Sequence, residues 1–124
     1  MINVKNHSIG AGVTDFISLA GTNGKEQMEG YLNANFRDNL ELYIERSPIF
    51  HIKNIKTPAL LQGGLSDQNV PHTQLKEFYH ALKKEGKTVK LIGYPNCTHD
   101  YYNPRLYLQF MKTNLEWIKK YFDE

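Results

Sequence analysis

An aspartate and a histidine stand in two polar loops of this chain and could form the acid–base pair of a hydrolase. Asp67 lies in residues 63–71 and His99 in residues 95–100, and each loop follows a short apolar run. A carboxylate beside an imidazole fixes the tautomer of the ring and stabilises its protonated form, as in a Ser-His-Asp triad. Alone, such an Asp is more often a turn former and such a His a solvated side chain. Asp67 and His99 therefore indicate an acid–base pair only if the fold brings their two loops together.

Three short segments have the pattern of strands that could position these loops. Residues 59–62 (ALLQ) end at a Gly-Gly pair, and residues 89–94 (VKLIGY) end at Pro95. Apolar runs between such breakers are typical of buried strands. Residues 6–11 form a weaker third candidate. We expect the strand that begins at residue 59 to end before Gly63.

Helical patterns alternate with these strands. In residues 71–85 the apolar side chains recur at i, i+3, i+4 and i+7, which predicts a helix with Gly86 as its C-terminal stop. Residues 103–122 carry apolar side chains spaced 3, 4, 3 and 4, namely Leu108, Met111, Leu115, Ile118 and Phe122. Residues 39–45 are predicted to be helical, and a further short turn of helix is predicted from residue 47.

Strands that alternate with helices predict an α/β fold, in which about three parallel strands are joined by crossover helices. Right-handed crossovers place the first two helical regions on one face, so the long C-terminal helix must cover the other. Ligands of such sheets bind beyond the carboxyl ends of the strands. We therefore expect Asp67 and His99 to meet at one rim, at the ends of adjacent strands.

Length and composition exclude several classes of protein. The 124 residues, 40% of them hydrophobic, suit one domain with one core. The formal charge of +2, without a basic and aromatic cluster, argues against a nucleic-acid partner. No apolar run approaches the ~20 residues of a membrane span, and residues 1–10 lack the apolar core of a signal peptide. The single cysteine, Cys97, excludes an internal disulfide. We expect a soluble cytoplasmic protein.

Motifs for metals and cofactors do not occur in the sequence. The five histidines show no ligand spacing, so no metal site is expected. Residues 10–12 (GAG) lack the third glycine of a dinucleotide loop, and Gly24-Lys25 is not followed by Ser or Thr as in a phosphate loop. We therefore expect no cofactor.

A resemblance to a known family rests on several short motifs in a fixed order. They are residues 10–18 (GAGVTDFIS), 47–58 (SPIFHIKNIKTP), 64–71 (GLSDQNVP), 79–86 (YHALKKEG) and 94–99 (YPNCTH). Together they resemble the C-terminal part of the catalytic domain of the prolyl oligopeptidase family, serine peptidases with an α/β-hydrolase fold. The similarity covers roughly residues 8–122. Several motifs in the right order are far more specific than any one of them.

The resemblance implies a role for three residues. Asp67 matches the triad acid and His99 the general base, in the chain order acid before histidine that α/β-hydrolases share. Asn69 falls where the family often contacts a substrate carbonyl, although a plain turn residue is about as good an interpretation. Three positions depart from the family pattern. Gly63 stands where the family usually has His, Leu65 where it commonly has an acidic residue, and Asp100 where it usually has Gly.

A nucleophile is the missing part of the triad. No Gly-x-Ser-x-Gly turn occurs in these residues. The nearest run, residues 6–10 (NHSIG), has Asn for the first Gly and falls where the family has a strand, so Ser8 is not expected to attack. Cys97 could be a reactive thiol, but an ordinary cysteine is favoured. The resemblance thus implies that residues 1–124 are a single partial hydrolase domain, without the nucleophile-elbow half and inactive alone.

Two interpretations stay open at this point. In the first, the chain is one part of a serine peptidase that acts on short peptides, with acylaminoacyl, dipeptidyl and prolyl specificities all open. In the second, it is a non-catalytic α/β module, the remnant of a split or truncated gene, that folds by self-association. In both, the free edge of the first strand predicts a partner, either a second copy in a homodimer or a separately encoded N-terminal part of the hydrolase.

Overall fold

Three parallel strands form a single sheet in this computed structural model, which describes residues 5–22 and 25–122. They are β1 (His7–Gly10), β2 (Ala59–Gly64) and β3 (Val89–Tyr94), in the order β1-β2-β3. The central strand β2 pairs in parallel with both neighbours. The predicted α/β class is confirmed, and so are all three predicted strands.

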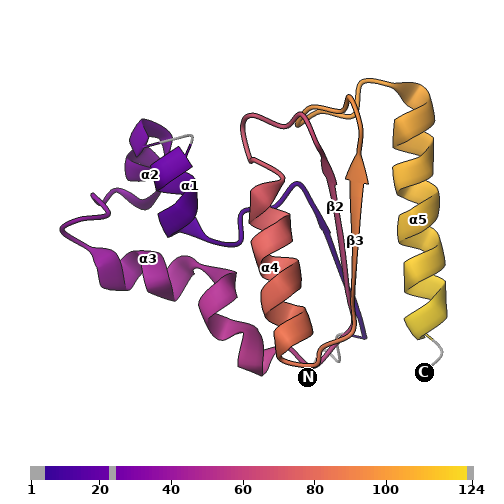
Figure 1. Cartoon of the computed structure of the whole chain (residues 1–124), viewed down its shortest axis with the longest axis horizontal. Coiled ribbons are helices and arrows are strands. Elements are labelled where there is room, and N and C mark those ends of the chain that lie inside the picture. The colour runs from indigo at the N-terminus through magenta and orange to yellow at the C-terminus, as the bar shows by residue number, and fades with distance from the viewer. Residues whose placement is uncertain (1–4, 23–24, 123–124) are drawn as a thin grey trace.

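Helices connect the strands and form layers on the two faces of the sheet. They are α1 (Phe16–Thr22), α2 (Lys25–Leu32), α3 (Leu40–Arg46), the 3-10 helix η1 (Pro48–Asn54), α4 (Thr73–Lys84) and α5 (Pro104–Phe122). Figure 1 shows α4 against one face and the long C-terminal helix α5 along the other, as predicted. Helices α1 to α3 lie on the α4 side but farther from the sheet, so α4 itself covers that face. None of the helices within the described residues is long and apolar enough to cross a bilayer.

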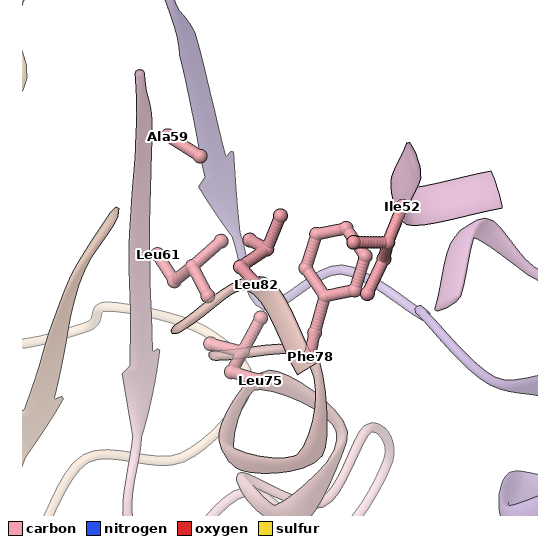
Figure 2. Close-up of a cluster of buried hydrophobic side chains, with 6 residues drawn as sticks. All are labelled: Ile52, Ala59, Leu61, Leu75, Phe78 and Leu82. Atoms are coloured by element: carbon pink, nitrogen blue, oxygen red, sulfur yellow. The ribbon is translucent and has the colours of Figure 1, made fainter. Parts of the chain in front are cut away.

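The core lies between α4 and the sheet. Figure 2 shows its six buried side chains, which are Ile52, Ala59, Leu61, Leu75, Phe78 and Leu82. Helix α4 contributes three of them at i, i+3 and i+7, which confirms the predicted apolar stripe. The helix ends before Gly86, whose φ of 68° is the left-handed conformation expected of a C-terminal stop.

Helices α1 and α2 were not expected from the sequence. Helix α1 has only seven residues, too few to show a repeated apolar stripe. Instead, Asp15 caps it, because its Oδ1 accepts the N–H groups of Ile17 and Ser18 at 2.9 and 3.2 Å. Gln74 of α4 holds the start of this segment, since its Oε1 accepts the N–H of Thr14 at 3.1 Å. Capping and a tertiary hydrogen bond therefore fix α1, and periodicity does not reveal either.

Strand β2 runs two residues farther than predicted. Gly63 and Gly64 do not end the strand but pair with Gly93 and Tyr94 of β3. A Cβ atom at Gly64 would lie 2.1 Å from the carbonyl oxygen of Cys97. Glycine is needed there because the loop that follows β3 crosses close over the end of β2.

Helix α5 covers the sheet with a different side from the predicted apolar stripe. Its sheet side includes Trp117, which is 7% exposed, and Asn114, whose Oδ1 accepts a hydrogen bond from Gln62 Nε2 at 3.0 Å. The predicted stripe points away and is 40% to 63% exposed along its length. The sheet face beneath α5 carries the fully buried amide of Gln62, which needs polar partners. The amide of Asn114 meets that need, so the side of the helix that carries Asn114 and Trp117 turns inward.

Two leucine-to-alanine changes test which side chains form the core. Leu82→Ala will lower the free energy of unfolding by about 2–5 kcal/mol, because the buried side chain leaves a cavity. Leu115→Ala makes the same change at a side chain that is 52% exposed, and its effect will stay within about 0.5 kcal/mol. Urea denaturation followed by Trp117 fluorescence measures both. Equal losses in the two variants would contradict this core.

Candidate active site

Asp67 and His99 lie in two loops that leave adjacent strands at the same end of the sheet. The last residues of β2 and β3 are register partners, so both loops start at one rim. A backbone hydrogen bond ties the loops together, because the N–H of Ser66 donates to the C=O of Cys97 at 3.0 Å. The prediction that the two loops share a rim is confirmed.

The two side chains are in direct contact. His99 Nδ1 donates to Asp67 Oδ2 at 2.8 Å. The side chain of Asp67 is 1% exposed, whereas that of His99 is 36% exposed. With Nδ1 as the donor, a neutral imidazole carries its lone pair on Nε2 and can accept a proton there. The pair thus has a buried carboxylate and a ring open to solvent.

The carboxylate of Asp67 is fixed in place by its own loop. Its Oδ1 accepts the backbone N–H groups of Asn69 and Val70, each at 2.9 Å. Such bonds from an Asp to the next residues define a tight turn. Asp67 is therefore both a turn former and the partner of His99. One oxygen shapes the loop and leaves the other for the imidazole.

Asn69, the third predicted site residue, lies beside the pair. It lines an open hollow of about 450 Å³ together with Ser66, Gln68, Thr98, His99 and Asp100. All of these residues come from the two rim loops, so the hollow sits where a ligand of a parallel sheet is expected. The structure thus brings the three predicted residues together.

The positions that depart from the family pattern have their own contacts. The side chain of Leu65 lies against β3, since a Cβ at Gly93 would come 2.5 Å from its Cδ2. Asp100 is exposed, and its Oδ2 accepts the O–H of Tyr102 at 2.9 Å. The carboxylate that follows His99 therefore turns to a tyrosine.

His72 is a residue near the site that sequence reasoning missed. Its ring lies beside both strands, 3.3 Å from where a Cβ at Gly63 or at Gly93 would be. Its Nδ1 is buried and has no hydrogen-bond partner among the described residues. Burial lowers the pKa of His72, the charge of Lys76 lowers it further, and Asp67 opposes both. No sequence signal marks this ring, because only the fold brings it between two strand glycines.

Neither candidate nucleophile of the chain is placed to attack. Cys97 is buried, and burial raises the pKa of its thiol, with a smaller contribution from the charge of Asp67. A thiol with a raised pKa is a poor nucleophile near neutral pH. Ser8 lies within β1, and its hydroxyl donates to Asn114 of α5.

Aromatic side chains support the loop that carries His99. The ring of Tyr101 packs on Tyr94 at the end of β3 and on Phe110 of α5, with centroid distances of 5.9 and 4.6 Å. Burial raises the pKa of Tyr101 to about 12. The loop is therefore anchored on both sides of His99 by packed groups. Within the described residues, no three His, Cys, Asp or Glu side chains are grouped so that they could hold a metal ion.

Known proteins resemble the chain in sequence and in structure. The model of the Prolyl oligopeptidase family matches residues 7–124. The acylamino-acid-releasing enzyme of Mus musculus is 47% identical over 60 residues, which are 48% of this chain and 8% of that enzyme. The same-named enzyme of Arabidopsis thaliana is 29% identical over 110 residues, or 89% of this chain and 14% of that enzyme.

Among solved structures, the acylaminoacyl peptidase of Pyrococcus horikoshii superposes with a TM-score of 0.87 and 27% identity. The match covers 94% of this chain and 20% of that chain. The chain spans 8% to 16% of the length of the curated relatives that it matches. It therefore corresponds to one part of their hydrolase domain.

The half-buried side chain of His72, whose Nδ1 is shielded from solvent, predicts a contribution to acid sensitivity. Its pKa is lower in the folded state than in the unfolded state, so unfolding takes up a proton at acidic pH. The stability that the neutral His72 ring contributes is fully present above the pKa of about 6.5 that it has in the unfolded chain. That contribution is lost as the pH falls through the lower pKa of the ring in the folded protein. We expect His72→Gln to lose less stability than the unsubstituted protein between about pH 7.5 and pH 5.

Urea denaturation at the two pH values measures this difference. His80→Gln, an exposed change on the same helix, is the matched control and is expected to follow the unsubstituted protein. An unchanged pH dependence in His72→Gln would show that the ring is solvated in the folded state.

Proposed function

Because the chain belongs to the prolyl oligopeptidase family, we propose that it carries the acid and the general base of a serine peptidase triad. Asp67 is the acid and His99 is the base. The observation that carries the proposal is the 2.8 Å hydrogen bond between His99 Nδ1 and the buried Oδ2 of Asp67. A carboxylate held in this way orients an imidazole for proton transfer.

The geometry suits each step that such a histidine performs. With Nδ1 bound to Asp67, Nε2 of His99 accepts the hydroxyl proton of a serine as the serine oxygen attacks the peptide carbonyl carbon. The same proton then passes from Nε2 to the amine that leaves. Asp67 remains ionised and stabilises the imidazolium that exists between these steps. In this proposal, the serine and the oxyanion donors come from residues outside these 124.

The proposed substrates are short peptides. Asn69 lines the hollow beside His99, so its side chain is the proposed contact for a substrate carbonyl. The names of the similar enzymes from mouse and Arabidopsis thaliana support peptides that carry an acylated first residue. Dipeptidyl and prolyl specificities are the alternatives.

The open edge of β1 is the proposed site at which a strand of the serine-bearing polypeptide pairs. Within the described residues, β1 pairs only with β2, and three of its four residues are exposed. Unpaired N–H and C=O groups on such an edge are a template for another strand. The same edge favours the second candidate, a non-catalytic module that folds as a homodimer.

A chimera tests the proposed triad. In it, residues 7–124 replace the matching segment of the Pyrococcus horikoshii acylaminoacyl peptidase. We expect the chimera to hydrolyse an N-acetylated peptide and to react with a fluorophosphonate probe. His99→Ala is expected to lower kcat by about a millionfold, as removal of a triad histidine does.

His80→Ala, at an exposed position of α4, is the matched control and is expected to leave kcat unchanged. Circular dichroism checks that each chimera folds. A folded chimera with full activity after His99→Ala would rule out the assigned base.

The chain of 124 residues is expected to be inactive by itself, because it contains no Gly-x-Ser-x-Gly turn. Incubation of the purified chain with the fluorophosphonate probe, followed by mass spectrometry, is expected to show no adduct. Stoichiometric labelling would overturn this part of the proposal and would favour a nucleophile within the chain.

A further inference from the structure

The ring of His72 lies across the ends of β2 and β3. A Cβ atom at Gly63 would lie 3.3 Å from its Nδ1, and a Cβ atom at Gly93 would lie 3.3 Å from its Nε2. Gly63 and Gly93 are register partners in the two strands. The ring therefore spans both strands, and the two glycines leave the room that it occupies. We call the space over Gly63 and Gly93 the glycine seat.

The glycine seat is enclosed by segments of this chain. Leu75 of α4 borders it at one strand, since a Cβ at Gly63 would lie 2.7 Å from Leu75 Cδ1. Leu65, in the loop after β2, borders it at the other, since a Cβ at Gly93 would lie 2.5 Å from Leu65 Cδ2. All of these contacts are made within residues 63–93, so they do not depend on what lies against the outer surface of the chain.

His72 also ends the loop that carries Asp67. Asp67 shapes the start of this loop, because its Oδ1 closes the turn after β2, and α4 begins directly after His72. The C=O of His72 accepts the N–H of Lys76 at 3.1 Å, so its backbone is held by the first turn of the helix. The loop is thus fixed at one end by β2 and at the other by His72. A shift of the ring would move the turn that directs Asp67 Oδ2 at His99.

The charge of Asp67 acts on His72, which places the ring near the carboxylate. Burial and the charge of Lys76 lower the pKa of His72, and the charge of Asp67 raises it. The strand positions that face the ring are glycines, so Lys76 and Asp67 are the charged groups that act on it within the described residues. Because its pKa lies below the ordinary value of 6.5, the ring is neutral at neutral pH. A neutral ring leaves the carboxylate of Asp67 to the imidazole of His99.

The shape of the His72 ring explains its place better than hydrogen bonding does. Its Nδ1 is buried and has no partner among the described residues, so no hydrogen bond there accounts for a histidine. The family pattern usually has His at position 63, where this chain has Gly63. Here a flat ring from position 72 fills the space above the strand at which that side chain is missing.

We propose that His72 is a positioning residue of the Asp67–His99 pair. Its ring fills the glycine seat and so holds the two rim loops where His99 Nδ1 reaches Asp67 Oδ2. The catalytic meaning of this inference rests on the proposed function, whereas the geometry belongs to the chain itself. Because the fit of a flat ring is what holds the loops, another flat ring is expected to serve and a small side chain is not.

Proton NMR of the full chain, labelled with 15N, tests this positioning through the signal of the His99 Nδ1 proton at neutral pH. A proton held in a stable hydrogen bond exchanges slowly with water and is observed, whereas local opening exposes it. We expect His72→Ala to broaden or remove this signal, because the loops separate, and His72→Phe to keep it. His80→Ala, at an exposed position of α4, is the matched control and is expected to keep the signal.

Circular dichroism checks the fold of each variant. If His72→Ala does not fold, His72→Val takes its place. The valine side chain fills only part of the glycine seat, so this variant is expected to weaken the signal.

The chimera adds a readout of catalysis. We expect His72→Ala to lower kcat about tenfold or more with little change in KM, because a small misplacement of a catalytic group costs a large factor in rate. His72→Phe is expected to restore kcat. The fluorophosphonate probe counts the active sites, so a mere loss of folded protein would leave kcat per site unchanged.

Three results would overturn the proposal. They are an unchanged His99 signal in the folded His72→Ala or His72→Val chain, a His72→Phe chain that loses the signal as fully as His72→Ala, and a chimera that His99→Ala inactivates but in which His72→Ala keeps full kcat. Full activity of the chimera after His99→Ala would instead refute the assigned base. The NMR signal of the chain would then still decide whether His72 positions the pair.

Discussion

The buried carboxylate of Asp67 is the group on which the rim of the sheet depends. A carboxylate with 1% of its side chain exposed is tolerated only when its oxygens are hydrogen bonded. Two backbone N–H groups of its own loop and the ring of His99 supply those bonds. The same three bonds shape the turn after β2, hold the loop after β3 against it and orient the imidazole. Structure and the proposed chemistry therefore rest on one group.

The two faces of the sheet are held by different forces. On the α4 face, six buried side chains form an apolar core, in which packing sets the position of the helix. On the α5 face, Gln62 accepts the O–H of Tyr94 at 2.6 Å and donates to Asn114 at 3.0 Å. Hydrogen bonds are directional, so this network fixes the rotation of α5 about its axis. It thereby also decides which side of the helix faces solvent.

The sequence predicts most helices and strands, but it predicts fewer of the contacts between them. Alternation of apolar runs and helical stripes was enough for the three strands, for α4 and for the meeting of Asp67 with His99, because parallel strands end at one rim. Periodicity shows that α5 has an apolar side, but it does not show what that side meets. The buried amide of Gln62 requires a hydrogen-bond partner, and Asn114 of α5 supplies it. This contact joins two segments that are distant in the sequence, so periodicity within α5 does not reveal it. The cap of α1 by Asp15 and the place of His72 likewise depend on contacts between distant segments.

At Gly64, the backbone of β2 lies in direct contact with the backbone of the loop that follows β3. The carbonyl of Cys97 sits where a side chain at position 64 would begin, so the two backbones bear on each other without any side chain between them. Because no side chain lies between them, one backbone cannot approach the other any further. The positions of Asp67 and His99 are therefore coupled twice, by the hydrogen bond between their side chains and by the contact between the backbones of their two loops.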